Sequence, residues 1–254
     1  MHNKKRLSTI ISVILLGIIA VGFLFPFVWM VATSLKPTTE VFSLSPTGSR
    51  IAWDNYPSAL NSIPFGRVVL NSFIVSLAGA ALVVVVSVLS AYAFARLRFK
   101  GRDHLFMLFL GTLVLPQEVL VIPLYIGMQR MGLVNSYFAL IVPFAFGAFG
   151  AFLIRQFLMS LPLEFEEAAR IDGCSDWKIL TKILLPLLKA PITVVGVFAF
   201  IDYWSAFLWP LIVVNDSSLA TIPLGLQMFS GERGTDWGPL MAAVTMTTIP
   251  SILL

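Results

Sequence analysis

Two carboxylates lie inside long apolar stretches of this 254-residue chain, where an isolated charge is expensive. Glu118 follows Pro116 and precedes Pro123, and because two prolines free backbone carbonyls, we expect a kinked helix beside a polar cavity. Asp202 lies near the middle of another stretch and shares its helical face with Ser205 and an aromatic residue. A carboxylate beside aromatic rings suits a sugar, because it accepts hydrogen bonds from hydroxyls while a ring covers an apolar sugar face.

Other interpretations of the two carboxylates stay open. Asp202 could bond to a polar side chain of a neighbouring subunit and pin a helix bundle. Glu118 could lie close enough to the membrane interface to reach water or a neighbour. A relay that carries protons through both residues is a third interpretation. The candidate residues for a transport path are Asp202, Tyr203, Trp204, Ser205 and Glu118.

The polar segment 155–189 carries a second pattern, which predicts a short helix ending at a glycine. Three glutamates place negative charge near the positive end of the helix macrodipole, and two alanines continue the helix with minimal side chains. Asp172-Gly173 then supplies a left-handed stop. The glutamates and alanines are Glu164, Glu166, Glu167, Ala168 and Ala169.

A second short helix should follow this stop, with Ser175 as its N-cap. Apolar residues at spacings of 3, 4 and 7 then predict one buried stripe, and Pro186 falls where the helix must bend into the next apolar stretch. The helix pair is either an amphipathic connector on lipid headgroups or a docking element whose small alanines enter a groove in a partner. The stripe consists of Leu180, Ile183, Leu184 and Leu187.

Composition indicates which elements hold these groups. Hydrophobic residues make up 58% of the chain and charged residues 12%, about half the share of roughly 25% in a soluble domain. This balance excludes a soluble globular enzyme, and it excludes disorder, which needs low hydrophobicity and high charge. One cysteine excludes a disulfide framework and a cysteine-built zinc site, and two histidines argue against a histidine metal cluster.

Six apolar segments are long enough to cross a bilayer, for which a helix needs about 20 residues. Helix is the expected state, because strand edges cannot be satisfied in hydrocarbon. We therefore expect an all-α, polytopic membrane protein with six transmembrane helices in a single domain over residues 1–254. The expected spans lie near 8–33, 68–95, 104–128, 134–157, 187–213 and from 237 to the end.

The distribution of basic residues predicts the orientation of these helices. With the N-terminus inside, 12 of the 17 Lys and Arg residues fall in inside loops, whereas acidic residues are almost evenly divided. The first segment is too long for a signal peptide and lacks a cleavage site, so we expect it to remain as a helix. Because no basic residue follows the last segment, which stops at Leu254, we expect a sixth helix truncated at its C-terminus and a longer natural chain.

The polar segment resembles a known family motif. Glu167-Ala168-Ala169, three residues, Gly173, nine residues and Ile183-x-Leu-Pro186 match the EAA loop of ABC importer permeases in the spacing of every element. Further short motifs resemble the smaller membrane subunit of maltose-type sugar importers. They are Ser34-Leu35-Lys36-Pro37, Trp53 with Asn55-Tyr56, Asn71-Ser72, Ile122-Pro123-Leu124-Tyr125 and Met131-Gly132-Leu133.

This resemblance implies an ABC importer type I permease fold and a role as the membrane-spanning permease of an ATP-driven, binding-protein-dependent sugar importer. The implied partners are a second permease in a heterodimer, two cytoplasmic ATP-binding subunits, an extracytoplasmic solute-binding protein, membrane lipid and the sugar. The implied location is a bacterial or archaeal inner membrane, multi-pass, with the N-terminus in the cytoplasm. The EAA loop at about 160–187 would couple to the ATPase through Glu167, Ala168, Ala169, Asp172, Gly173, Ile183 and Pro186.

The loop at 214–236 ends in a polar tip between glycines. In the resembling family this loop reaches into the binding protein and helps to displace the sugar, although a solvated turn is the simpler interpretation. The candidate contact residues are Gly231, Glu232, Arg233 and Gly234.

Motifs for catalysis are absent from the sequence. There is no phosphate-binding loop, nucleophile elbow, pair of catalytic carboxylates or metal motif. We therefore expect no enzyme activity, no cofactor and no nucleic-acid partner, with ATP hydrolysis left to partner subunits. The alternatives are a proton-coupled secondary transporter using Glu118 and Asp202, and a channel or scaffold subunit. Within the importer interpretation the cargo could be a disaccharide, an oligosaccharide or glycerol phosphate.

Overall fold

The computed structural model describes residues 2–231 and 234–253, without the side chains of residues 2–8 and 10. These residues are mostly helical, which confirms the all-α prediction, and a two-stranded hairpin is the sheet within them. The chain divides into two compact units, one formed by residues up to 66 together with those from 225 onward, the other by residues 67–224. The expected single domain over residues 1–254 stays a prediction.

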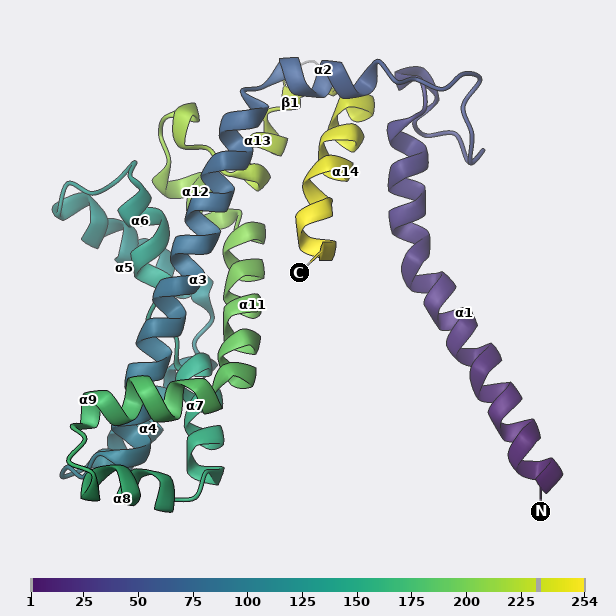
Figure 1. Cartoon of the computed structure of the whole chain (residues 1–254). Helices are drawn as coiled ribbons and strands as arrows, with labels where there is room; N and C mark the ends of the chain where they lie inside the picture. Colours follow the sequence, from purple (N-terminus) through teal and green to yellow (C-terminus); the bar gives the residue numbers. More distant parts are fainter. Residues whose placement is uncertain (1, 232–233, 254) are drawn as a thin grey trace. The chain divides into compact units, whose positions relative to one another are not determined.

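The larger unit contains most of the helices (Figure 1). In chain order they are α3 (Phe65–Arg96), α4 (Arg102–Gly111), α5 (Gln117–Arg130), α6 (Tyr137–Ile141), α7 (Ala148–Ser160), α8 (Glu164–Ile171), α9 (Asp176–Lys178), a π-helix (Ile179–Leu184), α10 (Leu185–Leu187), α11 (Lys189–Ser205), α12 (Leu208–Val213) and α13 (Ile222–Gln227), whose last residues enter the smaller unit. Short 3-10 turns lie at Thr112–Val114, Val142–Phe144 and Ser217–Leu219.

The smaller unit is built on α1 (His2–Ser34), α2 (Asn55–Ser62) and α14 (Trp237–Leu253). A 3-10 turn at Thr38–Glu40 follows α1, and the strands β1 (Ser230–Gly231) and β2 (Gly234–Thr235) precede α14. Asn55 fastens this unit, because its amide donates to the carbonyls of Ser34 and Lys36 at 2.8 and 2.9 Å. The Lys36 side chain is fully buried, with its ammonium 4.3 Å from the centre of the Trp29 ring.

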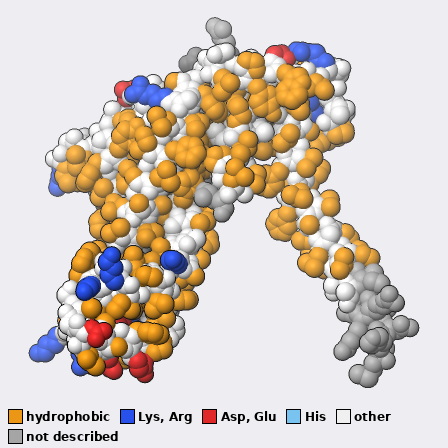
Figure 2. Space-filling model, viewed as in Figure 1, with side chains coloured by type: hydrophobic (Ala, Val, Ile, Leu, Met, Phe, Trp, Pro, Cys, Tyr) orange, Lys and Arg blue, Asp and Glu red, His pale blue; other side chains and the backbone are white. Residues whose placement is uncertain are grey.

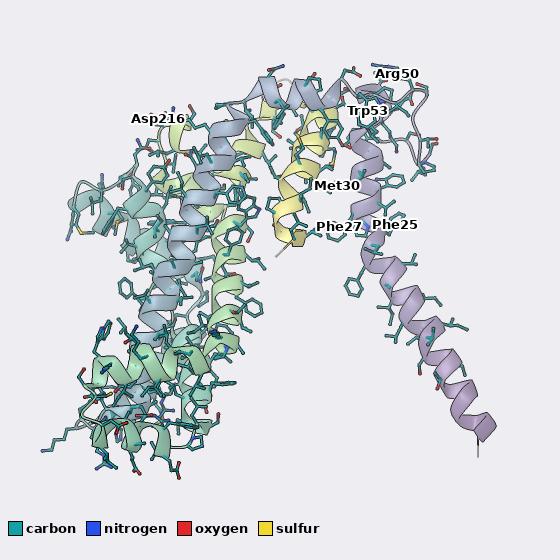
Figure 3. All side chains as sticks on the ribbon, in the orientation of Figure 1. Phe25, Phe27, Met30, Arg50, Trp53 and Asp216 are labelled. Atoms are coloured by element: carbon teal, nitrogen blue, oxygen red, sulfur yellow. The ribbon has the colours of Figure 1, made fainter. Side chains whose placement is uncertain are left out.

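Helix α1 and the segment before α2 leave large apolar side chains uncovered. Phe25 and Phe27 project from α1, and Trp53 lies beside Arg50 just before α2 (Figure 3). All three aromatic side chains are exposed. Since apolar residues in a membrane protein face lipid or another subunit, this surface needs one or the other, and Trp53 suits the membrane interface.

Two helices, α1 and α3, are long and apolar enough to span a membrane without interruption. The predicted spans at 104–128, 134–157 and 187–213 are not continuous helices. Each is broken, and the helical segments on either side of the breaks at 115–116, 145–147 and 188 meet at 102°, 47° and 81°. Pro116 accounts for the sharpest break, because it lacks an N–H and its ring excludes a continuing helix. The sixth predicted segment is occupied by α14, a shorter apolar helix.

Helices α3 and α11 run side by side within the larger unit (Figure 1) and approach closely at Gly79. A Cβ at Gly79 would lie 2.5 Å from the ring of Tyr203, whose hydroxyl donates to the Ile141 carbonyl at 2.5 Å. The same two helices also meet through the rings of Phe73 on α3 and Trp204 on α11, which pack edge to face. The absence of a side chain at Gly79 therefore permits the contact that holds α11 against α3.

The substitution Gly79→Ala should destabilise the larger unit by about 1–3 kcal/mol, because the added methyl group overlaps an aromatic ring that is held by a hydrogen bond. Thermal unfolding of the purified complex measures this effect. Gly111→Ala is the matched control, since a Cβ there meets nothing within 4 Å. Equal melting temperatures for the two variants would contradict the packing argument.

Candidate functional site

Helix α8 ends in a turn at Gly173, as the sequence predicts. We call residues 164–187, in which this turn joins α8 to a second helical arm that begins with α9, the elbow. Gly173 has φ +76°, and the amides of Cys174 and Gly173 donate to the carbonyls of Ala169 and Arg170 at 2.9 and 3.0 Å. These two bonds make a Schellman motif, which satisfies the free carbonyls at the helix end. The left-handed stop at Asp172-Gly173 is therefore confirmed, and the elbow has a defined direction.

The second arm of the elbow begins as expected and then departs from the expected register. Ser175 accepts a hydrogen bond from the Lys178 amide and caps α9. Residues 179–184 then form a π-helix, which widens the turn. The predicted stripe is consequently wrong at its end: Leu187 is exposed and Leu188 is fully buried. The chain bends by 81° at Leu188, two residues after Pro186, which agrees with the expected bend.

The elbow presents some of the predicted coupling residues and buries others. Glu167, Ala168, Asp172, Gly173 and Pro186 are exposed, and Ile183 is half-buried. Ala169 is 5% exposed and packs into the core formed by α3, α7 and the π-helix. Ala169 therefore serves the attachment of the elbow and is not available to a partner.

Sequence reasoning missed two large apolar residues on this surface. Ile171 is 87% exposed and Trp177 is 65% exposed, one on each arm of the elbow. Exposed aromatic and aliphatic anchors are the residues that contribute most to protein interfaces. In the sequence, both residues lie among polar residues, and this position could have indicated that they are exposed. Figure 2 shows charged side chains gathered at this end of the larger unit, so the elbow combines apolar anchors with a charged surround.

A buried ion pair attaches the elbow to the long helix α3. Arg96 Nε lies 2.5 Å from Glu166 Oε1, without the alignment of a hydrogen bond, and both side chains are more than nine-tenths buried. A second arginine lies close by: Arg155 donates to the Phe94 carbonyl at 3.2 Å and lies over the Phe106 ring at 4.1 Å. Sequence reasoning assigned Glu166 to the helix dipole and did not find the pairing, because its partner is 70 positions away.

A cavity of about 390 Å³ lies farther along the larger unit. Four of the five predicted path residues line it: Glu118, Asp202, Tyr203 and Ser205. Trp204 does not line the cavity, and it stacks on Phe200 instead. The remaining polar lining includes Gln117 and Trp209, and none of the lining residues is Lys or Arg.

The cavity is bordered by three breaks in the helices. Leu113 and Gln117 flank the break at 115–116, and Phe144 and Gly147 lie at the break at 145–147. Ala206 lies at a further break, between the end of α11 and the start of α12. Irregular backbone at membrane depth is tolerated where it lines a polar cavity or is covered by protein. A cavity beside the break at Pro116 is thus present, as expected, but most of its lining is apolar and its polar character comes from a few side chains that include Glu118 and Asp202.

Asp202 and Glu118 enter this cavity without partners. Both side chains are exposed, and no described residue makes a hydrogen bond or ion pair with either. Asp202 lies in the last turn of α11, and not near the middle of a continuous span, because the helix ends at Ser205 before an extended Ala206. The neighbouring Trp209 is fixed, since its indole donates to the Ala139 carbonyl at 2.8 Å. The cavity therefore offers two free acceptors against a rigid aromatic wall.

The predicted binding-protein tip is a short hairpin. Gly231 pairs with Gly234 and Ser230 with Thr235, and the hydroxyls of the latter two lie 3.0 Å apart. Glu232 and Arg233 lie outside the described residues. In the same loop region, Asp216 (Figure 3) accepts hydrogen bonds from Ser218, which hold the pKa of its carboxyl below the usual value.

A match to a known protein family shows to which family the chain belongs. The model of the binding-protein-dependent transport system inner membrane component matches residues 83–254, which include the elbow and most of the cavity lining. The chain belongs to this family. It is a multi-pass inner-membrane permease subunit of an ABC importer, and ATP hydrolysis in such importers is done by separate subunits.

Relatives of this permease cover nearly its whole length. A sn-glycerol-3-phosphate transport system permease from Pectobacterium atrosepticum is 38% identical over all of this chain and 93% of its own. A lactose transport system permease from Rhizobium radiobacter is 31% identical, over 99% and 92%. An arabinooligosaccharides transport system permease from Halalkalibacterium halodurans is 33% identical, over 99% and 93%.

The fold of this permease also matches a solved structure. A bacterial ABC transporter involved in the import of the acidic polysaccharide alginate superposes with a TM-score of 0.86. The match covers 98% of this chain and 94% of that one at 23% identity. The ABC importer permease fold that the sequence motifs imply is therefore confirmed.

Proposed function

We propose that this chain forms half of the carbohydrate path in an importer and couples that path to ATP hydrolysis through the elbow of α8 and α9. A second permease supplies the other half, two ATP-binding subunits dock on the elbow, and a solute-binding protein delivers the cargo. The proposal rests on one observation: the same unit contains both a rigid, exposed elbow and a cavity at the helix breaks that is lined by two carboxylates. Partnership with other subunits of the importer is a property of the family.

The elbow faces the cytoplasm in this proposal. The excess of Lys and Arg in the loops on its side of the membrane favours that orientation, which also places the N-terminus inside. Ile171 and Trp177 then act as apolar anchors in a groove of the ATPase. Glu167 and Ala168 lie on the exposed side of α8 and set the register, because a small residue allows close approach and a charge selects its complement.

A neutral carbohydrate is the cargo that suits the cavity. Glu118 and Asp202 can accept hydrogen bonds from hydroxyls, and Tyr203 and Trp209 supply aromatic surface. The relatives carry names that refer to glycerol 3-phosphate, lactose and arabinooligosaccharides. Two carboxylates without a basic residue repel a phosphate, so we favour a sugar over glycerol phosphate.

Glu167→Lys and Gly173→Pro should each reduce uptake about tenfold or more with membrane insertion intact, because the first reverses a docking charge and the second cannot adopt φ +76°. Uptake in proteoliposomes and co-purification of the ATPase subunits measure the effect. Asp54→Lys is the control, since Asp54 is an exposed acid away from the elbow. Normal ATPase co-purification together with normal uptake would overturn the docking role. Uptake without ATPase subunits that follows the proton gradient would favour the carboxylate relay.

Asp202→Asn and Glu118→Gln should raise the apparent KM for the sugar about tenfold, since a hydrogen bond to a charged group contributes about 1.5–3 kcal/mol. The measurement is concentration-dependent uptake with saturating binding protein. Trp204→Phe is the matched control, because Trp204 is two residues from Asp202 on the same helix and does not line the cavity. Wild-type kinetics in both carboxylate variants would remove them from the path.

Deletion of residues 231–234 should impair uptake while the complex still assembles, because the described residues at the two sides of the tip, Gly231 and Gly234, are exposed. Assembly is checked by co-purification, and the loss by titrating the binding protein against ATP hydrolysis. Replacing Glu232 and Arg233 by serine keeps the chain length and separates their charges from the hairpin itself. Normal stimulation by the binding protein in both variants would reduce the tip to a solvated turn.

A further inference from the structure

The guanidinium of Arg96 joins three helices at one point. Arg96 is the last residue of α3, and its Nη2 donates to the carbonyls of Leu158 and Leu161 at 2.8 and 3.2 Å, at the C-terminal end of α7. Its Nε lies against Glu166 in the first turn of α8. The fork of an arginine can serve several acceptors at once in a fixed geometry, so these ends are held in one arrangement.

The ion pair is enclosed, unlike the other acid–base pairs that the structure describes. The Arg96 and Glu166 side chains are 8% and 5% exposed, whereas those of Arg170 and Asp176, which bridge the elbow, are both 51% exposed. The helices that carry the pair also share one hydrophobic core, to which Tyr92 from α3, Leu158 from α7 and Ala169 from α8 belong. Salt and water therefore screen it little.

The enclosed ion pair adds little to the free energy of folding, because the desolvation of two charges offsets most of their attraction. Its effect on position is stronger. A purely apolar contact between α3 and α8 can slide, whereas the ion pair fixes their separation at this point. The two carbonyl bonds fix the same guanidinium against the end of α7. The arrangement suits the transmission of movement, and α8 is the element on which movement would be imposed.

We propose that Arg96 is a positioning residue that makes α8 move as one body with α3 and α7, so that displacement of the elbow reaches the spans directly. This proposal rests on the docking role proposed above for the elbow. The docking role and the positioning role can be tested separately. Docking depends on the exposed Glu167 and Gly173, whereas the contact between α3 and α8, which we call the joint, depends on the enclosed Arg96 and Glu166. Loss of the joint uncouples an ATPase that still binds.

The test compares Arg96→Met, Glu166→Met and the double variant in the complete transporter. Each single variant leaves one buried charge unpaired and should lower the yield of complex, and the double variant should restore the yield. The double variant should still retain the ATPase subunits, but sugar uptake per complex should fall at least tenfold and hydrolysis should lose its stimulation by loaded binding protein. A double variant that assembles and transports within twofold of wild type would overturn the proposal.

Two controls separate the joint from general loss of packing. Arg155→Met removes an arginine with an 11% exposed side chain that ties α7 to α3 without touching α8, so uptake per assembled complex should stay near wild type. Equal uncoupling by Arg155→Met would overturn the specific role of Arg96. Arg50→Met with Asp54→Met removes an exposed pair and should change nothing.

A covalent cross-link in place of the ion pair tests the proposal even where the methionine variants assemble poorly. Cys174 is the single cysteine of the chain, so Arg96→Cys with Glu166→Cys can be made in a Cys174→Ser background. A short bifunctional thiol reagent then bridges α3 and α8 in the assembled complex. Uptake should be low before bridging and should rise at least fivefold after it, because the link restores a single moving body. Uptake that stays low after bridging, or that is normal before it, would overturn the joint.

Discussion

The absence of water from the hydrocarbon layer is the constraint on which this structure depends, since every backbone group there must find a partner within the protein. Long apolar segments such as α3 satisfy this constraint by forming one continuous helix. Two of the bent segments leave helical hydrogen bonding near Leu115 and Ala145, and α11 ends at Ser205 before an extended Ala206. Residues that flank all three positions line one cavity. The breaks are therefore not independent irregularities but a shared place where backbone groups can face polar surroundings.

The elbow obeys a related requirement outside the spans. A short polar helix such as α8 is not stable alone, because few residues cannot offset the cost of helix nucleation. The Schellman motif at Gly173 satisfies the carbonyls at its C-terminal end, and the buried Ala169 and the Arg96–Glu166 pair attach it to the rest of the larger unit. The result is a small rigid projection with exposed anchors, Ile171 among them. Residues of the predicted docking motif thus also stabilise the local fold.

Local signals allowed the sequence to predict the helical class, the apolar segments and the stop at Gly173, because each depends on residues that are close in the chain. The π-helix that brings Leu188 rather than Leu187 to the core was not predictable, since it is set by packing of the second arm against α3 and α7. Trp204 is two residues from Asp202 but packs against Phe73, and helical periodicity alone could not show which face of α11 borders the cavity. Pairings between distant positions, such as Arg96 with Glu166, carry no local signal at all.

The geometry of two helices explains how the elbow and the cavity can act together. Helix α11 begins directly after the bend at Leu188 and carries Asp202 in its last turn, 17 residues in all, which at 1.5 Å per residue is about 25 Å. Helix α3 runs from Arg96 to Val75 and Val83 in the cavity lining. Packed helices resist compression and bending over such lengths, so a tilt at the elbow reaches the cavity along two parallel elements. A transporter that changes cavity shape by rocking whole helices needs only a firm attachment at the driven end, and the enclosed arginine supplies it.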